Sequence, residues 1–539
     1  GYNSFPELNS KIVQCSAFCV QNTPINGYKG VYTNLNKAPQ SANKNNVFLI
    51  RDPLLDFHLS SGDFEKIPGS PLAYWAGDNV LKAFSENRNL KHYIKPKQGT
   101  STGDDETFVR YWHEVSLILL DKNSSSLDEA LSCGGVYFPL NKGGDFRKWY
   151  GNHEKVIKLG GSAYSQLLEM GNNLPSRDLY FHAGITWSKI TSSVFSCRLD
   201  PQGFVFSSVG LKGFPQADNS LYVLAFMNSI VMQHIVRMVS PTISIVSGDL
   251  EKVPVIFDDR YADKISHLAE RVLEISKLDW DSSETSWNFR ALPIIKATSL
   301  NCISSCLESI HNESQKLIEE TVKKEEEINR IFIELYNLND QLSPIVPLSQ
   351  ISLVQNTIFT NGKADKNIYF NNRIIELMSY SLGCMMGRFS LNGEGPIYAN
   401  TGNSGFKELV AKGAYQKFPA DDDGIVPLAS EDWLFGDDAT ARFREFVKTV
   451  WGEKHLQENL EFVAESLCFN ALKPAKNESA NDTVRRYFSK QFYKDHCKTY
   501  KKRPIYWLFS SGKEKAFECL VYLHRYNEGT LSRMRTEYV

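Results

Sequence analysis

Lysine and arginine side chains stand beside aromatic, glycine and small polar residues at three places between residues 64 and 256. The residues there that could touch a nucleic acid are Thr102, Arg110, Lys142, Arg147, Lys148, Trp149, Trp187, Lys189 and Arg198. Glycine lets a backbone approach a groove, arginine and lysine reach phosphates or guanine edges, and aromatic rings stack. The pattern therefore predicts DNA contact. In the competing interpretation the aromatic rings form a core and the basic groups pair with Asp104, Asp145 or Asp200.

Two blocks of opposite charge lie in the last third of the chain and cancel in its net charge of −2. Residues 421–465 hold twelve Asp or Glu against four Lys or Arg, a balance of −8. Residues 484–539 hold thirteen Lys or Arg against five Asp or Glu, a balance of +8. Lys501, Lys502 and Arg503 are the candidate phosphate contacts of the basic block. Alternatively, the two blocks pair with each other.

The motifs that carry catalysis or hold a cofactor are missing from the sequence. The chain has no GxGxxG, and its one GxG, Gly393-Glu394-Gly395, runs into Pro396 and opens no helix. No Pro-Pro dipeptide occurs, so the loop with which amino-methyltransferases hold a flipped base is absent. We therefore predict no catalytic and no cofactor-binding residues in this chain.

The ten cysteines are dispersed, and no signal peptide precedes them, which predicts reduced thiols in a cytoplasmic protein. Two CxxxC spacings, Cys15 with Cys19 and Cys302 with Cys306, lie among apolar neighbours, so we predict no metal site. The longest apolar stretch, residues 221–239, is interrupted by polar residues and predicts a buried helix, with no contact to a membrane.

At roughly 150 residues per domain, 539 residues predict three or four domains. Near the start, residues 12–20 and 28–35 alternate like strands around a turn, which predicts a hairpin of a larger sheet. Residues 36–46 are polar and predict a linker. Short segments separated by glycine and proline turns indicate a loop-rich α+β domain over residues 64–256.

Helical periodicity dominates after residue 256. Ile265, Leu268, Val272 and Ile275 mark one amphipathic helix. A second helix is predicted from a 4/3 spacing at positions 303, 307, 310, 314, 317, 321, 324, 328, 331, 335 and 338. Its apolar ends and polar middle favour a spacer arm of roughly 55 Å over a self-dimerising coiled coil, with a local helical hairpin as the alternative. Residues 344–539 are mainly helical in pattern, so the fold class is α+β.

Several long strings resemble the PglX adenine-specific DNA methyltransferases of BREX phage-defence systems. They are FEKIPGSPLAYW at 64–75, TGDDETFVRYWHEV at 102–115, GITWSKI at 184–190, DWDSSETSW at 279–287, SYSLGCMMGRFS at 379–390 and YKKRPIYWLFSSG at 500–512. The resemblance runs along the whole chain and keeps one order. It implies that the chain is the carboxy-terminal part of such an enzyme.

The resemblance also implies a domain plan and partners. Residues 1–46 would be terminal strands of the catalytic methyltransferase sheet and 64–256 the DNA target-recognition domain. Residues 257–343 would be a helical spacer arm and 344–539 a mainly helical carboxy-terminal domain. The complete enzyme would use S-adenosyl-L-methionine to methylate adenine N6 in double-stranded DNA. Its partners would include the catalytic methyltransferase half and other BREX proteins.

Two functions stay open at this point. The chain could be the DNA sequence-recognition portion of the enzyme, inactive on its own because no residue matches the family's catalytic motifs. Alternatively, it could be a protein-interaction scaffold that docks other components of the defence complex.

Overall fold

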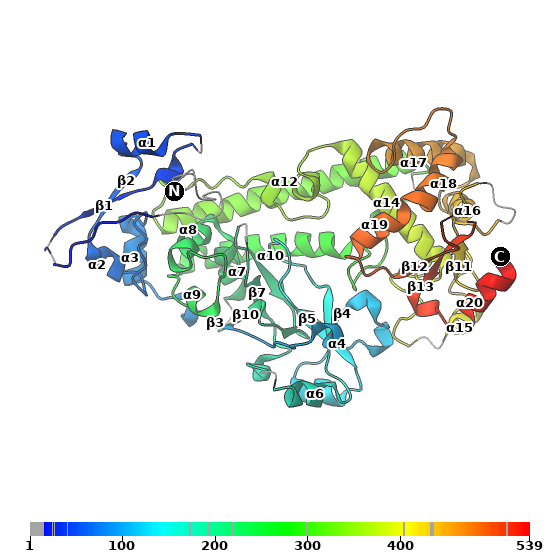
Figure 1. Cartoon of the computed structure of the whole chain (residues 1–539), viewed down its shortest axis with the longest axis horizontal. Helices are drawn as coiled ribbons and strands as arrows, with labels where there is room; N and C mark the ends of the chain where they lie inside the picture. Colours follow the sequence, from blue (N-terminus) through cyan, green and yellow to red (C-terminus); the bar gives the residue numbers. More distant parts are fainter. Residues whose placement is uncertain are drawn as a thin grey trace.

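A computed structural model of the chain describes residues 16–23, 25, 27–39, 41–171, 174–191, 194–216, 219–297, 300–402, 405–431, 436–513 and 516–538. The molecule is elongated, and two long helices run side by side along it (Figure 1). These are α10 (Asp259–Asp281) and α12 (Ile303–Leu335). Small sheets lie at one end of this pair and a mainly helical region at the other.

The sequence predicted α10 correctly. Asp258 begins the helix, because its side chain accepts a hydrogen bond from the backbone N–H of Arg260. The apolar positions Ile265, Val272 and Ile275 are buried. Ion pairs from α10 to α12 fix the antiparallel register: Lys264 with Glu327 at 2.5 Å and Arg271 with Glu320 at 2.9 Å.

The prediction of a long helix is confirmed by α12, which spans 33 residues, about 50 Å at 1.5 Å per residue. Its role as a spacer stays a prediction. Its apolar ends lie in two different cores. Ile303 and Leu307 pack in the carboxy-terminal core, while Ile328 and Phe332 pack in the core near the small sheets. The apolar positions of the 4/3 series on α12 are therefore covered by other parts of the same chain, as in the predicted helical hairpin.

The region 64–256 holds two four-stranded sheets. The first has the order β3 (Ile94–Lys97), β10 (Gly210–Pro215), β7 (Gly184–Ser188), β8 (Cys197–Asp200). The second has the order β4 (Val109–Tyr111), β6 (Lys155–Lys158), β5 (Tyr137–Asn141), β9 (Val205–Phe206). Only the β5–β9 pair is parallel among the described strand pairs. The shorter helices of this region are α4 (Asp105–Phe108), α5 (Leu127–Ser132), α6 (Ala163–Glu169) and α9 (Ser247–Leu250).

The apolar stretch 221–239 is buried as predicted, but it forms two helices and not one. Helices α7 (Ser220–Asn228) and α8 (Ile230–Val239) meet at an angle of 76°. Ser229 causes the break, because its backbone is extended and its hydroxyl caps α8 by accepting from the N–H of Met232. Among the described helices none is long and apolar enough to cross a membrane alone, and this bent pair meets the length and composition criteria only when joined.

The start of the described chain differs from the predicted hairpin. Residues 12–15 lie outside the described residues, and residues 16–20 form no strand. β1 (Gly30–Thr33) falls inside the predicted segment 28–35 but pairs antiparallel with β2 (Asp56–Leu59). The alternation found the strand, but pairing with a later segment depends on contacts that local pattern does not encode.

The predicted linker at 36–46 folds back on itself. Lys44, the first residue of α1 (Lys44–Ile50), is buried, and its ammonium donates to the carbonyls of Leu35, Ala38 and Pro39 at 3.1, 3.1 and 2.9 Å. Two further helices, α2 (Ser61–Glu65) and α3 (Asp78–Glu86), lead into the sheets.

The last region is mainly helical, as predicted, and encloses one small sheet. The helices are α11 (Pro293–Lys296), α13 (Thr357–Asn361), α14 (Lys366–Met385), α15 (Phe406–Ala411), α16 (Ala439–Trp451), α17 (Leu456–Asn470), α18 (Ala480–Lys490), α19 (Phe492–Thr499) and α20 (Thr530–Arg533). The sheet has the antiparallel order β11 (Ile425–Pro427), β13 (Glu518–Tyr522), β12 (Tyr506–Ser510).

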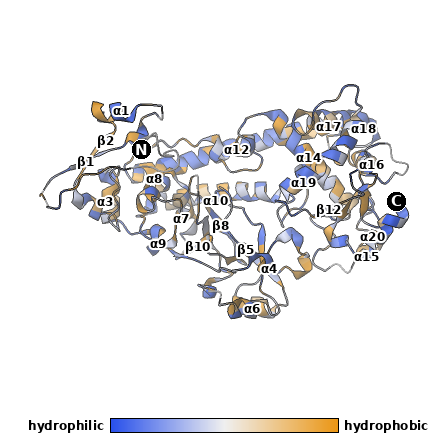
Figure 2. Ribbon diagram, in the orientation of Figure 1, coloured by the Kyte–Doolittle hydropathy of each residue, from blue (hydrophilic) through white to orange (hydrophobic). Residues whose placement is uncertain are grey.

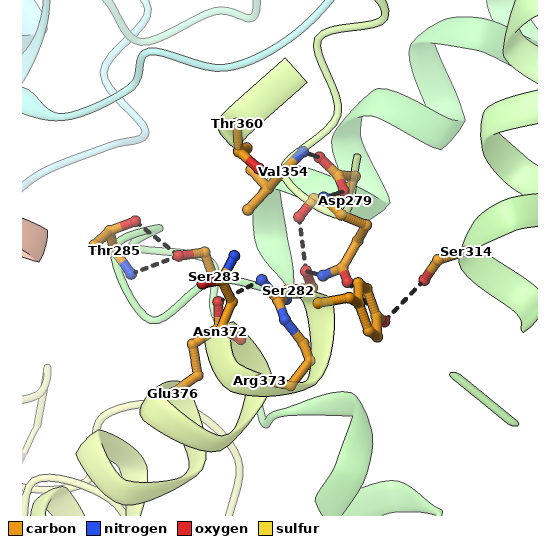
Figure 3. A network of polar contacts seen from close by, with 12 residues as sticks. Asp279, Ser282, Ser283, Thr285, Ser314, Val354, Thr360, Asn372, Arg373 and Glu376 are labelled. Atoms are coloured by element: carbon orange, nitrogen blue, oxygen red, sulfur yellow. Dashed lines mark hydrogen bonds and ion pairs between the residues drawn. The ribbon is translucent and has the colours of Figure 1, made fainter. Parts of the chain in front are cut away.

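A polar network joins the end of α10 to this helical region (Figure 3). The buried carboxylate of Asp279 accepts from the backbone N–H groups of Val354 and Gln355 at 2.6 and 3.1 Å. On α14, Arg373 lies 2.8 Å from Glu376. Burial raises the pKa of Glu376 to about 7 against the opposing charge of Arg373. The Asp279 hydrogen bonds tie the end of α10 to the segment that leads to α13, and the Arg373–Glu376 pair lies within α14.

The buried His496 of α19 leads us to predict that this region loses stability as the pH falls. Its Nε2 accepts from the backbone N–H groups of Ile505 and Tyr506 at 3.2 and 3.1 Å, which requires an unprotonated nitrogen. Burial, with the charge of Arg388, lowers the pKa of His496 to about 3. The unfolded imidazole, with a pKa near 6.5, takes up a proton first as the pH falls.

The contribution of His496 to the free energy of unfolding is therefore fully present above about pH 6.5. It is lost as the pH falls from about 6.5 to about 3, by at most about 1.4 kcal/mol per pH unit. We expect His496→Gln to reduce by about one the number of protons that the chain takes up on unfolding in this pH range. Urea titrations between pH 7 and 4.5 measure it, and equal slopes for the two proteins would contradict the assignment.

Candidate nucleic-acid interface

Five of the predicted DNA contacts are buried in the structure. The exposed fractions are 5% for Thr102, 4% for Lys148, 2% for Trp149, 0% for Trp187 and 1% for Arg198. Side chains this deeply buried do not present a surface to DNA in this conformation. For these five residues the structure agrees with the competing interpretation, in which aromatic and basic side chains lie in the interior.

Glu325 of α12 explains why two of them are buried. One carboxylate oxygen lies 2.6 Å from the ammonium of Lys148, and the other accepts from the indole N–H of Trp149 at 2.7 Å. Glu325 itself is 4% exposed. The spacer helix is thus docked on the sheets through a buried ion pair that also satisfies the indole.

Arg147 and Arg198 lie close together and also serve the fold. Nη1 of Arg147 donates to the carbonyl of Ser352 at 2.8 Å, and its guanidinium lies 4.8 Å from the ring centre of Trp280. Nη1 of Arg198 lies 3.3 Å from the carbonyl of Arg147. Burial lowers the pKa of both guanidinium groups. Neither side chain is available for a groove without movement of its neighbours.

Asp200, one of the predicted counterions, anchors a separate buried network. Its carboxylate lies 3.4 Å from Nζ of Lys212 and 3.2 Å from Nε2 of His153, and it accepts from Asn141 at 2.8 Å. Burial alone would raise the pKa of Asp200, but Lys212 and His153 hold it below its usual value. This network joins β8, β10 and β5, so it ties the two sheets together.

Of the predicted contacts outside these networks, Lys142 and Lys501 both lie near enough to Lys155 to affect its pKa. Lys142 pairs with Asp105, which also accepts from the hydroxyl of Thr102 at 2.6 Å. Lys501, from the far end of the chain, lies 2.6 Å from Glu154. Arg110, on the edge strand β4, turns its guanidinium back to the carbonyls of Val109 and Glu106.

Lys155 links these groups and was missed from the sequence. Its ammonium lies 3.2 Å from the ring centre of Tyr111, its cross-strand partner. Burial, together with the charges of Lys142 and Lys501, lowers the pKa of Lys155 to about 8, and the charges of Glu154 and Glu114 oppose this shift. We call Lys142, Lys155, Lys501 and Arg503 the basic face, because Lys155, Lys501 and Arg503 lie near Tyr111 and Lys142 lies near Lys155. Lys502 is exposed beside it.

Lys189 lies in a second accessible feature, where four loops meet. Its backbone N–H donates to Val209 at 2.9 Å, and its carbonyl accepts from Ile245 at 2.7 Å. Ser188 donates to the carbonyl of Gly144 at 2.8 Å. We call residues 143–146, 188–191, 207–209 and 241–246 the loop cluster. The ammonium of Lys189 makes no hydrogen bond or ion pair with any described residue.

The loop cluster also exposes apolar side chains, with Ile190 at 60% and Ile243 at 64% exposed. Gly143 needs to be glycine, because its φ is +73° and an added Cβ would meet the carbonyl oxygen of Val209 at 3.0 Å. The cluster is thus closely packed at its base and carries one basic and two exposed apolar side chains, those of Lys189, Ile190 and Ile243.

A cleft of about 1390 Å³ lies between the end of α10, α12 and the loop 392–401. Its charges balance, with four basic side chains and four acidic ones: Lys122, Lys277, Arg290, Lys296, Glu274, Asp281, Glu313 and Glu394. This balance does not favour binding of a polyanion.

The two charge blocks meet at Arg525, but this contact is to backbone and not to acidic side chains. Arg525 of the basic block donates to the backbone carbonyls of Asp421 and Asp422 at 2.6 and 2.7 Å. Lys501 instead pairs with Glu154, outside the acidic block.

Comparisons with known proteins place these features in a family context. No family model matches the chain. It is 44% identical, over an alignment of 548 residues, to the adenine-specific methyltransferase BrxX of Escherichia coli O9:H4 (strain HS). It is 32% identical over 559 residues to the adenine-specific methyltransferase PglX of Lacticaseibacillus casei (strain Zhang). Each alignment covers 100% of this chain and 44% of the relative, so the chain spans less than half the length of the curated relatives it matches.

Proposed function

We propose that this chain is the DNA-recognition portion of an adenine-specific methyltransferase. The proposal starts from its homology, over its whole length, to part of the adenine-specific methyltransferases BrxX and PglX. The observation that carries the proposal is the basic face. It joins Lys142 and Lys155 of the sheets to Lys501 and Arg503, which lie more than 300 residues later. A face assembled from both regions fits contact with the phosphates of double-stranded DNA.

The energetics of Lys155 support this assignment. The charged amine of Lys155 is half-buried over Tyr111 and lies near Lys142 and Lys501. An approaching phosphate would stabilise it by adding to the negative charge of Glu154 and Glu114. Phosphate contacts fix the register of a protein on the duplex but do not read sequence. Base reading therefore needs a second surface.

We assign base reading to the loop cluster. Lys189 has an ammonium without a partner among the described residues, and lysine contacts guanine O6 and N7. Ile190 and Ile243 present apolar groups of the kind that contact thymine methyls or wedge between base steps. We keep residues 64–256 as the recognition domain, 257–343 as the spacer arm and 344–539 as the carboxy-terminal domain.

S-adenosyl-L-methionine is the methyl donor that the complete enzyme implies, but the one GxG of this chain does not fit it. Gly393-Glu394-Gly395 lies in a loop, with the N–H of Gly395 bonded to the carbonyl of Arg290 at 2.6 Å. The loop runs into Pro396 and opens no helix whose N–H groups could receive the cofactor. We therefore propose that the catalytic half binds the cofactor and flips the adenine.

An apolar surface near β1 and α1 supports contact with another protein part. Phe48, Leu49, Ile50 and Leu54 are 44, 68, 74 and 79% exposed. Figure 2 shows the hydrophobic end of α1 at the edge of the molecule. Contiguous exposed apolar side chains mark interaction sites. We propose that this surface packs against the catalytic half, and that docking of other BREX proteins is the alternative use.

The proposal is tested by the salt dependence of DNA binding. We expect the triple variant Lys501→Ala, Lys502→Ala, Arg503→Ala to bind all duplex sequences more weakly. The log–log salt slope should flatten by about 0.9 for each phosphate that the variant no longer neutralises. Anisotropy titrations with a labelled genomic duplex at several salt concentrations measure the slope.

The matched control removes the same charge elsewhere. Lys316, Lys323 and Lys454 are exposed and lie outside the basic face. Their replacement by alanine is expected to leave the slope nearly unchanged. If the two triple variants behave alike and stay folded, the basic face does not contact DNA and the scaffold function is favoured.

From the lowered pKa of Lys155 we predict that DNA binding depends on pH. With a pKa of about 8, its amine loses charge between pH 7 and 9, so affinity for the duplex falls as the pH rises. We expect a decrease of up to about tenfold at pH 9 at constant ionic strength. Lys155→Arg keeps the charge and should bind with little change over this range. An unaltered pH profile in Lys155→Arg would exclude Lys155 as its source.

A further inference from the structure

Cys302, His455 and Glu458 converge in the carboxy-terminal region, although 153 positions separate the first two. Sγ of Cys302 lies 3.6 Å from Nδ1 of His455, and Oε2 of Glu458 lies 3.2 Å from the same nitrogen. One ligand atom from each residue lies within 4.8 Å of the others. We propose that these three side chains bind a zinc ion.

The ligand types and spacings fit zinc. Thiolate, imidazole and carboxylate are its usual protein ligands, whereas calcium and magnesium prefer oxygen alone. Tetrahedral zinc with bonds of about 2.3 Å to sulfur and 2.0–2.1 Å to nitrogen separates those two atoms by about 3.6 Å. The nitrogen and a carboxylate oxygen are then about 3.4 Å apart. The distances in the structure are close to both values.

The arrangement differs from that of a catalytic triad. In a triad the nucleophile and the acid contact different ring nitrogens of the histidine. Here Cys302 and Glu458 both face Nδ1, which can give only one proton. A cation between the three groups satisfies all of them, and its binding converts the Cys302 thiol to a thiolate with release of one proton.

The surrounding structure holds the ligands in place. Cys302 is the residue that begins α12, and His455 and Glu458 lie at the start of α17. Asn459 clamps the chain on both sides of Cys302. Its Oδ1 accepts from the N–H of Ile303 at 2.7 Å, and its Nδ2 donates to the carbonyl of Asn301 at 3.3 Å. Asn459 is 1% exposed, so the site rests on two packed helix ends.

The site opens to solvent on one side. The Glu458 side chain is 62% exposed and that of His455 26%. Three protein ligands with an open position leave room for a water as the fourth. We assign the ion the role of bracing the first turn of α12 against α17. Cys306 of the predicted CxxxC pair is not a ligand, because its thiol donates to Ala297 and Leu300 at 3.3 and 3.1 Å.

The test uses zinc and the whole 539-residue chain. After exposure to zinc and dialysis, we expect one zinc per chain by mass spectrometry of the metal. Cobalt in its place should show thiolate charge-transfer and tetrahedral d–d bands. Cys302→Ser should bind zinc more than about 100-fold more weakly, since the loss of a ligand exceeds the 10–100-fold effect of outer contacts. Serine is a good helix-capping residue, so this variant should fold.

Two further variants complete the design. Glu458→Gln changes an exposed side chain and should also lose affinity for zinc without unfolding the chain. Cys19→Ser removes an exposed thiol elsewhere and should bind zinc as the unmodified chain does. Equal zinc binding in Cys302→Ser and Cys19→Ser, or no zinc retained by the unmodified chain, would overturn the proposal. Neither result depends on DNA binding.

Discussion

Replacing Glu325 by alanine is expected to lower the free energy of unfolding by about 3–5 kcal/mol, because it leaves the Lys148 ammonium buried without its counterion. The indole N–H of Trp149 loses its acceptor in the same step. Both effects fall where the spacer helix docks on the sheets. The spacer should therefore undock, and DNA binding should weaken as a secondary effect.

Urea unfolding followed by circular dichroism measures this prediction, and three variants separate the causes. Glu319→Ala lies on the exposed side of the same helix and should change stability by less than about 0.5 kcal/mol. Glu325→Gln keeps an acceptor for the indole but removes the charge. The double variant Lys148→Met, Glu325→Leu removes both charges and should recover the part of the stability lost through the unpaired ammonium, but not the part lost at the Trp149 indole. A decrease below about 1 kcal/mol in Glu325→Ala would show that the pair does not hold the junction.

The long helices could be predicted from sequence because periodicity is local. Apolar residues at 3.6-residue spacing fixed α10, and the 4/3 series fixed α12 and its polar middle. The buried polar residues Ser314, Thr321 and Glu325 have reasons that only the tertiary structure supplies. The break at Ser229 was hidden in an apolar run, although a serine followed by an amphipathic turn is a helix-start signal.

The candidate site could be predicted only in part, because composition does not distinguish a buried cation from an exposed one. Lys148 and Trp149 look like DNA contacts until Glu325, more than 170 positions away, is seen to bind both. Lys155 carries no motif, and its environment depends on Lys501 from the far end of the chain. The convergence of Cys302 with His455 is equally non-local.

The packing also affects which segments can be exchanged between relatives to transfer DNA sequence specificity. The core of the region 64–256 continues past its end, since Ile265, Val272, Phe332 and Tyr336 pack in the same cluster as α7 and α8. A graft cut at residue 256 would divide this core. Exchanging the loop segments 143–146 and 188–191 leaves the core and the basic face intact, so it is the sharper experiment.

Lys189→Ala is expected to relax the methylated motif at one position when built into the full-length enzyme, because a good base contact contributes about 1–3 kcal/mol of discrimination. Long-read mapping of methylated adenines across a genome measures the motif directly. A phosphate contact would instead lower methylation at every site alike. Arg110→Ala is the matched control, since its guanidinium bonds to backbone carbonyls of its own segment and should leave the motif unchanged.

Exchange of the two loop segments with those of a relative that methylates another motif should transfer part of that motif, because the segments carry Lys189 and Ile190 on an unchanged base. The fold is checked by its unfolding midpoint. If an active enzyme keeps its motif after both Lys189→Ala and the loop exchange, the loop cluster does not read bases. Sequence choice would then have to come from the basic face through DNA shape, where the same mapping would show graded changes over several positions instead of one.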